Sequence, residues 1–463
     1  MKRILTMLFT TMLLAAALCV GASAADFNSV AEDLSAIGMF RGTANGFELD
    51  RAPTRSEAAI MLVRLYGAED AAKTAYDAGE IKHPFTDVSA FTSPYVAWLY
   101  TNGITNGTSA TTFGSANSCS TTNYVVFLLR ALGYKDGTDF QYADALTFAQ
   151  EKGFFDAAVF SGTFLRDDLA AVTYQALAAD MADGKTYLLD SLIQSGAIDA
   201  KAAAPMTQKI EVYRAMEAAT AGMDETAMDM DINMKMGMTM SYAGQSETMN
   251  YDVTGNMKVI AKDPTAIQLA ANLNMTADGQ TVKVGEWMKD GWMYVSMDDG
   301  TDQMAYKYQL GDQLAALEEI GSLPATSANV SGLALIDSIT SAKSGSNTVY
   351  TVVIGKAMAG YMDELVSSIG EAAGAGIGMD LSDITMTITA DAKGQLKAIG
   401  AAFDMAMKMP MEDGTSVNVA YTFDMDLNVK ATGSSVKITY PDFSGYQEID
   451  ESQAPDLTGG IAA

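Results

Sequence analysis

Three stretches within the first 200 residues repeat one pattern, a helix, a glycine-rich turn and a second, apolar helix. The most complete stretch covers residues 84–134 and opens with Phe-Thr-Asp-Val at 85–88. Its first helix is predicted to end at Gly103, because glycine tolerates the left-handed cap conformation. A turn containing Gly107 then leads to the second helix, for which Ser120 or Thr121 can serve as the N-cap.

Two further copies flank this unit, at residues 26–67 and 140–180. In each copy the first helix ends at a glycine and a phenylalanine follows the turn: Gly38, Gly103 and Gly153, then Phe47, Phe113 and Phe164. A unit of this size cannot bury its apolar faces alone, so the three copies are expected to pack on one another.

The motifs at 85–88 (FTDV), 102–113 (NGITNGTSATTF) and 54–57 (TRSE) resemble those of the S-layer homology family. The resemblance covers roughly residues 26 to 200. It implies three tandem repeats that form an all-α, pseudo-threefold prism. It also implies non-covalent binding of a secondary cell-wall polymer, typically a pyruvylated one.

The N-terminus has the pattern of a secretory signal. Lys2 and Arg3 precede an apolar run, and Ala22-Ser23-Ala24 supplies a small-residue cleavage pattern, so residues 1–24 are predicted to be removed. The chain carries 57 acidic and 29 basic side chains, a formal net charge of −28. This excess argues against nucleic acid as a partner and fits a soluble extracellular surface.

Arg55 and Arg166 are the main candidate ligand contacts. Thr54 and Glu57 around Arg55 fit a capping box, but an arginine in the first helical turn opposes the helix dipole and needs another cause. The family resemblance implies that this arginine holds an anionic glycan, for which a planar fork on a ketal carboxylate is the physical reason. A surface or inter-repeat salt bridge is the competing role.

The copies differ at this position. Alignment places Thr121 opposite Arg55, whereas the third copy restores an arginine at Arg166. Asp87 of the Phe-Thr-Asp-Val motif is present in the second copy and has no counterpart in the other two. Complete binding constellations are therefore expected in only one or two of the grooves between copies.

Trp98 and Gly107 complete the predicted wall-polymer site. Trp98 falls in the middle of the first helix of the second copy, where it can pack in the core or form a sugar-stacking wall. His83 is the sole histidine, so a histidine-based zinc site is excluded, and no metal site or cofactor is predicted.

The second half of the chain has a different period. From Met228 to Tyr242 apolar and polar residues alternate strictly, which predicts a long, half-buried strand. More strands follow, separated by turn signals, with helices predicted at 311–321 and 356–370. The expected architecture is an α+β antiparallel curved sheet, a half-barrel with covering helices. Stretches such as GNMKVIAKDPTAIQLAANLNM (255–275) resemble the lipoprotein-carrier superfamily, which implies an apolar cavity.

The predicted domain order has seven parts: a signal peptide at 1–24, three S-layer homology repeats at 25–80, 81–137 and 138–200, a linker at 201–209, a half-barrel-like domain at 210–445 and an irregular tail at 446–463.

Methionine is the notable residue of the second half. The chain has 31 methionines, and many fall on inward strand faces, where a flexible, polarizable side chain can fit varied apolar shapes. An ordinary core is the competing interpretation. Carboxylates fall on polar strand faces and in turns, and the chain has no nucleophile elbow and no phosphate loop, so no enzyme activity is predicted. A weak calcium site at 298–302 is an alternative to a plain turn.

Together these features predict a secreted protein of the cell wall or S-layer. Its repeats would anchor it to a secondary cell-wall polysaccharide, and its second half would take up a hydrophobic or lipid-like ligand. The alternative is a purely structural S-layer or envelope coat protein with no small-molecule ligand.

Overall fold

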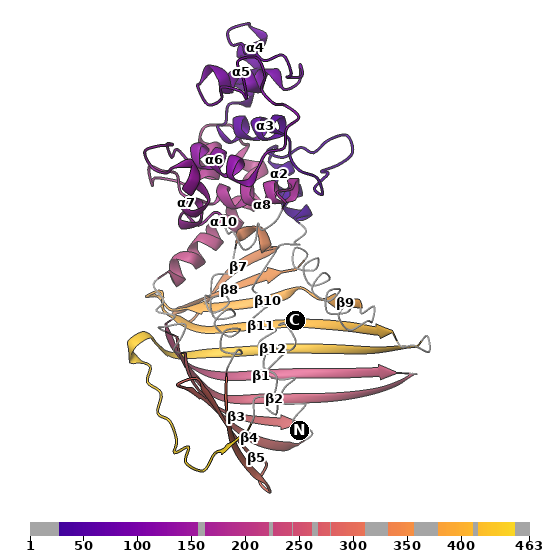
Figure 1. The fold of residues 1–463 in the computed structure, drawn as a ribbon, viewed down its shortest axis with the longest axis vertical. Helices are drawn as coiled ribbons and strands as arrows, with labels where there is room; N and C mark the ends of the chain where they lie inside the picture. Colours follow the sequence, from indigo (N-terminus) through magenta and orange to yellow (C-terminus); the bar gives the residue numbers. More distant parts are fainter. Residues whose placement is uncertain are drawn as a thin grey trace.

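The computed structural model describes residues 27–155, 163–221, 226–242, 244–261, 267–277, 279–310, 332–355, 378–410 and 415–449. A helical part comes first in the chain and a large curved sheet follows it (Figure 1). The helices are α2 (Asn28–Ala36), α3 (Arg55–Leu65), α4 (Glu69–Asp77), α5 (Ser93–Thr101), α6 (Thr121–Ala131), α7 (Ala145–Glu151), α8 (Arg166–Leu177), α9 (Leu188–Gln194) and α10 (Ala200–Thr220).

The predicted helix pairs are present as α2 with α3, α5 with α6, and α7 with α8. Thr54 caps α3, with Glu57 completing the capping box, and Ser120 rather than Thr121 caps α6. The second helices α3, α6 and α8 each bury a row of apolar side chains, and Leu62, Leu128 and Leu177 are fully buried in the core.

Backbone hydrogen bonds join the start of one second helix to the segment that precedes another. Arg55 N–H donates to Asn117 O (2.8 Å) ahead of α6, and Cys119 N–H donates back to Pro53 O (2.8 Å). In the same way Arg166 N–H at the start of α8 donates to Arg51 O (2.9 Å) ahead of α3. These links hold the N-termini of the second helices next to loops of neighbouring units.

Two helical segments differ from the sequence prediction. Residues 201–209, predicted as a linker, belong to α10, because Asp199 caps Ala202 N–H (2.8 Å) and the alanines that follow favour a helix. Helix α4 was not predicted, since Ala72 is its one buried residue and no apolar stripe marks it in the sequence.

The sheet contains thirteen described strands in the order β13-β6-β5-β4-β3-β2-β1-β12-β11-β10-β8-β7, with β9 beside β11. All pairs are antiparallel except β13 with β6. The sheet curves without closing (Figure 1). In the strand order, β7 and β13 are its two ends. The strands are β1 (Ala227–Tyr242), β2 (Gln245–Ile260), β3 (Gln268–Ala277), β4 (Gln280–Lys289), β5 (Trp292–Asp298), β6 (Gln303–Gln309), β7 (Ser338–Ser344), β8 (Asn347–Ile354), β9 (Gly378–Leu381), β10 (Ile384–Ala390), β11 (Leu396–Pro410), β12 (Ser416–Thr432) and β13 (Gln447–Glu448).

The alternation predicted for β1 is confirmed. Its methionines from Met228 to Met238, together with Ile232, are buried on one face, while Asn233 and Lys235 are exposed on the other. We call the methionine-bearing face the inner face and the opposite face the outer face. The helices predicted at 311–321 and 356–370 as cover for the inner face lie outside the described residues.

The strand expected at 435–440 is absent, and this part of the prediction was wrong. Residues 436–442 form no ladder, and Tyr440 instead donates its hydroxyl hydrogen bond to Met288 O (3.1 Å) of β4. Residues 447–448 of the predicted irregular tail pair with β6.

Helix α10 lies between the helical part and the sheet (Figure 1). Tyr350 of β8 donates a hydrogen bond to Ala215 O of α10 (3.2 Å), and Ala334 N–H donates to the Gln175 side chain of α8 (3.1 Å). One continuous apolar cluster runs from the helices into the sheet.

Candidate functional site

The turn between α5 and α6 is built around Asp87. Its Oδ1 accepts a hydrogen bond from Phe113 N–H (2.7 Å), and its Oδ2 accepts from Gly114 N–H (2.8 Å) and Ser115 N–H (3.0 Å). Desolvation would raise the pKa of Asp87, but the three N–H groups lower it below its ordinary value. The carboxylate therefore fixes the backbone at 113–115.

Gly107 packs the same turn tightly. Its φ is +73°, and a Cβ added there would lie 2.4 Å from Phe85 Cε1 and 2.6 Å from Thr112 O. Any side chain at this position would displace the turn, so glycine is required for both its conformation and its size.

Arg55, the first residue of α3, reaches this turn from the neighbouring unit. Its Nε donates to Phe113 O (3.2 Å), and its guanidinium lies over the Phe113 ring at 5.1 Å from the centroid. The side chain is half-buried, and within the described part of the chain it forms no ion pair. We call Arg55 and the turn at 107–115, braced by Asp87, the arginine site.

Arg166 occupies the equivalent position in α8 but a different environment. Its side chain is only 4% exposed, and it pairs with Glu57 at 2.7 Å. Its Nε donates to Phe47 O (2.9 Å), and its guanidinium lies over the Phe40 ring at 4.8 Å. These contacts engage Nε and Nη1 of Arg166 with partners from the first unit.

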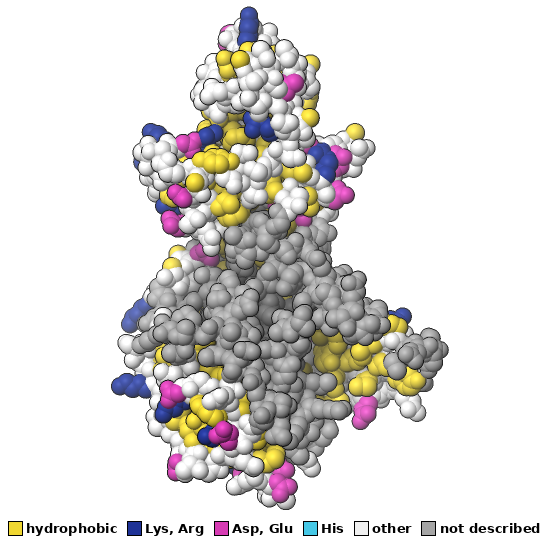
Figure 2. Space-filling view, in the orientation of Figure 1, with side chains coloured by type: hydrophobic (Ala, Val, Ile, Leu, Met, Phe, Trp, Pro, Cys, Tyr) yellow, Lys and Arg dark blue, Asp and Glu magenta, His cyan; other side chains and the backbone are white. Residues whose placement is uncertain are grey.

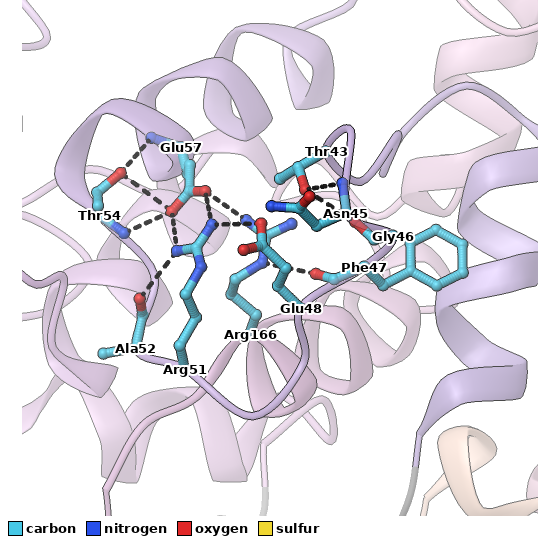
Figure 3. A network of polar contacts seen from close by, with 10 residues as sticks. All are labelled: Thr43, Asn45, Gly46, Phe47, Glu48, Arg51, Ala52, Thr54, Glu57 and Arg166. Atoms are coloured by element: carbon cyan, nitrogen blue, oxygen red, sulfur yellow. Dashed lines mark hydrogen bonds and ion pairs between the residues drawn. The ribbon is translucent and has the colours of Figure 1, made fainter.

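Glu57 is the centre of that network, and Figure 3 shows Arg51 and Arg166 both directed at its carboxylate. Arg51 binds it at 2.6 Å, and Thr54 N–H donates to it at 2.8 Å. Burial would raise the pKa of Glu57, but these partners hold it below the ordinary range. The sequence identified Glu57 only as a capping residue, and its neighbour Arg51 carried no signal.

Trp98 lies apart from the arginine site. It is half-buried in α5 and packs against Tyr66, just beyond the C-terminus of α3, with ring centroids 5.4 Å apart. Helix α3 has eleven residues, so its two ends are about 16 Å apart. The structure therefore brings Arg55, Asp87 and Gly107 together, and it places Arg166 and Trp98 elsewhere.

Phe113 is the residue of the arginine site that was not singled out as a contact. It provides the carbonyl and the ring that position Arg55, and it packs against Phe85 at 5.8 Å. The recurrence of a phenylalanine after each glycine-rich turn was the available signal.

The inner face of the sheet is a second candidate. Across β4 and β5 it carries Val284, Met288, Met293, Val295 and Met297, all buried. Glu286 lies on the same face of β4, directly opposite Val295 of β5. Burial raises the pKa of Glu286 to about 7.

Acidic side chains of the turn at 298–302 bind the turn itself. Asp299 Oδ1 accepts from Thr301 N–H (2.8 Å) and Asp302 N–H (2.7 Å), and Asp298 Oδ1 accepts from Gly300 N–H (2.9 Å). Among the residues that the structure describes, no group of three or more histidine, cysteine or acidic side chains is placed to hold a metal ion. None of the described helices combines the length and the hydropathy needed to cross a membrane.

Comparison with protein families identifies one match, in which residues 84–115 fit the family model of the S-layer homology domain. A comparison with curated proteins gives no match. Among solved structures, the chain is similar to LprF from Mycobacterium bovis, with 15% identity, a TM-score of 0.23 and coverage of 51% of this chain and 96% of that one. It is also similar to the ywiB protein from Bacillus subtilis, with 12% identity, a TM-score of 0.13 and coverage of 44% and 95%. A DUF1329 family protein from Desulfovibrio piger has 10% identity, a TM-score of 0.16 and coverage of 50% and 95%.

Proposed function

Because residues 84–115 are an S-layer homology domain, we propose that the chain is a secreted protein held non-covalently on the cell wall by an anionic polysaccharide. In this proposal residues 25–200 form three such repeats in a pseudo-threefold prism, and the polymer is a pyruvylated secondary cell-wall polymer. The hydrogen bonds that link residues 53–55 with 117–119, and 166–167 with 49–51, support packing of the first repeat against each of the other two.

The proposal rests on the environment of the Arg55 side chain. Its guanidinium is held in place by Phe113 but lacks a carboxylate partner among the described residues. It also lies at the N-terminus of α3, where the helix dipole favours an anion. A ketal carboxylate can accept a forked pair of hydrogen bonds from the free edge of this guanidinium. Asp87 and Gly107 act by positioning the turn.

Arg55→Ala in the full chain tests this role by co-sedimentation with purified cell walls. We expect binding to weaken about tenfold, since a charge-assisted pair contributes about 1.5–3 kcal/mol and a tenfold change is 1.4 kcal/mol. Arg55→Lys should recover only part of the loss because lysine lacks the planar fork. Walls stripped of pyruvyl groups should bind native protein and Arg55→Ala equally.

Lys135→Ala is the matched control, because Lys135 is exposed and this change removes the same charge. If Lys135→Ala weakened wall binding as much as Arg55→Ala, the loss would be explained by net charge alone. Unaltered retention of Arg55→Ala on pyruvylated walls would contradict the role of Arg55.

The second half is proposed to take up a hydrophobic or lipid-like ligand on its inner face. The support is the methionine-bearing face of β1, whose last members Met240 and Tyr242 are 43% and 44% exposed. Apolar side chains are also visible on the surface near one end of the long strands (Figure 2). Methionine surfaces adapt to varied apolar shapes. A coat protein without a ligand is the alternative.

A fluorescent fatty acid such as cis-parinaric acid distinguishes the two. We expect binding that saturates at one molecule per chain and an affinity that Met240→Asn lowers severalfold. Thr239→Asn is the control, because Thr239 is the adjacent residue on the outer face and bonds Thr248 there. The absence of saturable uptake by the native chain would favour the coat protein.

A further inference from the structure

A row of small residues crosses the outer face of the sheet from β3 to β6. The register places Asn272 opposite Gly285, Gly285 opposite Ser296, and Ser296 opposite Ala305. Gly285 carries no side chain, and the indole ring of Trp287, two residues further along the same face of β4, lies over it. Gly285 cannot be larger, since an added Cβ would lie 2.1 Å from Trp287 Cη2 and 2.7 Å from Ser296 Oγ.

The next row along the same face is polar. It consists of Asn274, Lys283, Asp298 and Gln303 on the same four strands. Gln303 donates its side-chain N–H to Asp298 Oδ2 (3.2 Å), which fixes one end of the row. Asn274 and Lys283 are exposed, and their side chains form no hydrogen bond or ion pair with the described residues.

The C-terminal segment 440–449 forms the facing wall. Phe443 stacks on Tyr294 with ring centroids 3.8 Å apart and an interplanar angle of 14°, and Tyr446 meets both Tyr294 and Trp287 edge-on. Residues 447–448 then pair with β6. The wall is thus held by an aromatic cluster at one point and by a strand ladder at the next.

These parts enclose a cavity of about 960 Å³, open to solvent, which we call the outer trough. Its volume is that of a typical ligand site, and four strands span about 14 Å, since neighbouring strands lie about 4.8 Å apart. The two rows supply amides, a hydroxyl, one ammonium group and one carboxylate, which are balanced in charge although the whole chain carries −28.

We propose that the outer trough binds a neutral oligosaccharide. A sugar chain presents hydroxyl groups that both donate and accept hydrogen bonds, and the amides of Asn272, Asn274 and Gln303 can do both in return. The trough's balanced charge does not select an ionic ligand. Its floor crosses four strands, about 14 Å, which fits a linear chain of several sugar units better than a single small molecule.

The location of the protein strengthens this choice, and this part of the argument rests on the proposed function. A chain already held on wall polymer meets neighbouring glycans at a high effective concentration, so a weak second site suffices to add avidity. The outer trough lies on a different part of the chain from Arg55, so the two sites can be tested independently.

Calorimetric titration of the full chain with chitotetraose at millimolar concentrations tests the proposal. The expected result is saturable binding with one molecule per chain. Asn272→Ala combined with Asn274→Ala should weaken it about tenfold, because the two substitutions remove side-chain hydrogen bonds to the sugar. Both side chains are exposed, so their truncation should leave the fold intact, which circular dichroism verifies.

Asn250→Ala combined with Asn428→Ala is the matched control, since both are exposed asparagines on the outer face of β2 and β12. Arg55→Ala should leave chitotetraose binding unchanged even if wall anchoring fails. Three results would each overturn the proposal: no binding of chitotetraose, an equal loss of affinity in the control variant, or binding of tetra-alanine in place of the sugar.

Discussion

At the scale of single residues, Glu69 is a carboxylate with four side-chain partners in the helical part. It accepts hydrogen bonds from Arg41 (3.0 Å), Arg64 (3.0 Å), Lys73 (2.7 Å) and the Tyr95 hydroxyl (2.6 Å). Burial would raise the pKa of Glu69, but the hydrogen bonds from Lys73 and Tyr95 and the charge of Arg64 lower it to about 2. This carboxylate therefore joins α3, α4 and α5 through its ionised form.

Glu69→Gln should destabilise the chain at pH 7 by about 1–2 kcal/mol, a value reduced from the usual range for charged hydrogen bonds because solvent partly screens the site. Since the folded-state pKa lies below the ordinary value of 4.5, this contribution is complete above pH 4.5 and is lost as the pH falls toward 2. Urea unfolding at pH 7 and at pH 3 measures the difference between the variant and the native chain.

Asp70→Asn provides the comparison, because Asp70 is the next residue of α4 and is exposed. It should change the unfolding free energy by less than about 0.5 kcal/mol at either pH. A gap between Glu69→Gln and the native chain that is the same at pH 7 and pH 3 would contradict the assigned role of the ionised carboxylate.

Arg55 and Arg166 show what the sequence could and could not predict about the candidate site. Their place at the first position of α3 and α8 follows from the repeat alignment. Their different environments do not, because the partners of Arg166 are remote in sequence, Phe47 by 119 residues and Glu57 by 109. Local pattern cannot reveal which of two equivalent arginines is neutralised by a distant carboxylate.

At the scale of elements, the strands with a strict alternation were predictable and the chain's path after the last long strand was not. β1 was identified because one of its faces is continuously apolar. Residues 435–440 were expected to form another strand, but β12 already pairs with β1 on one side and β11 on the other. No edge is free beside it, so the chain crosses the outer face and reaches the edge of β6 instead.

The polar strand β6 and the first half of helix α10 are elements that the sequence pattern did not predict. β6 has one buried residue among its seven and gives a weak alternation signal, yet backbone pairing with β5 defines it. α10 includes Pro205, which the sequence prediction treated as part of a linker. Capping by Asp199 and burial of Ala203 and Met206 outweigh the hydrogen bond that the proline removes.

At the scale of the whole molecule, the helical part and the sheet share one apolar core. The C-terminal half of α10 contacts β7 and β8, and Met216 within it is fully buried. A fragment ending at residue 221 would expose this surface. We expect its melting temperature to fall about 5–10 °C below that of the first transition of the full chain, since one or two lost side-chain contacts amount to about 2–4 kcal/mol.

Differential scanning calorimetry of the fragment and the full chain measures this shift, and dye binding should report the newly exposed apolar surface. A fragment that melts with the full chain and binds no dye would show that the helical part is thermally independent of the sheet.

The register of β1 with β12 has a consequence for how the protein is made. Met228 pairs with Thr432, so the two strands at the middle of the sheet are separated by roughly 200 residues of chain, a contact of long range that forms slowly. During synthesis, β1 emerges with one hydrogen-bonding edge unpaired and its methionine-bearing face exposed, and it stays so until almost the entire chain has been made. The central pairing, of β1 with β12, is therefore the last to form. Until it forms, two half-sheets present unpaired edges through which the chain can aggregate.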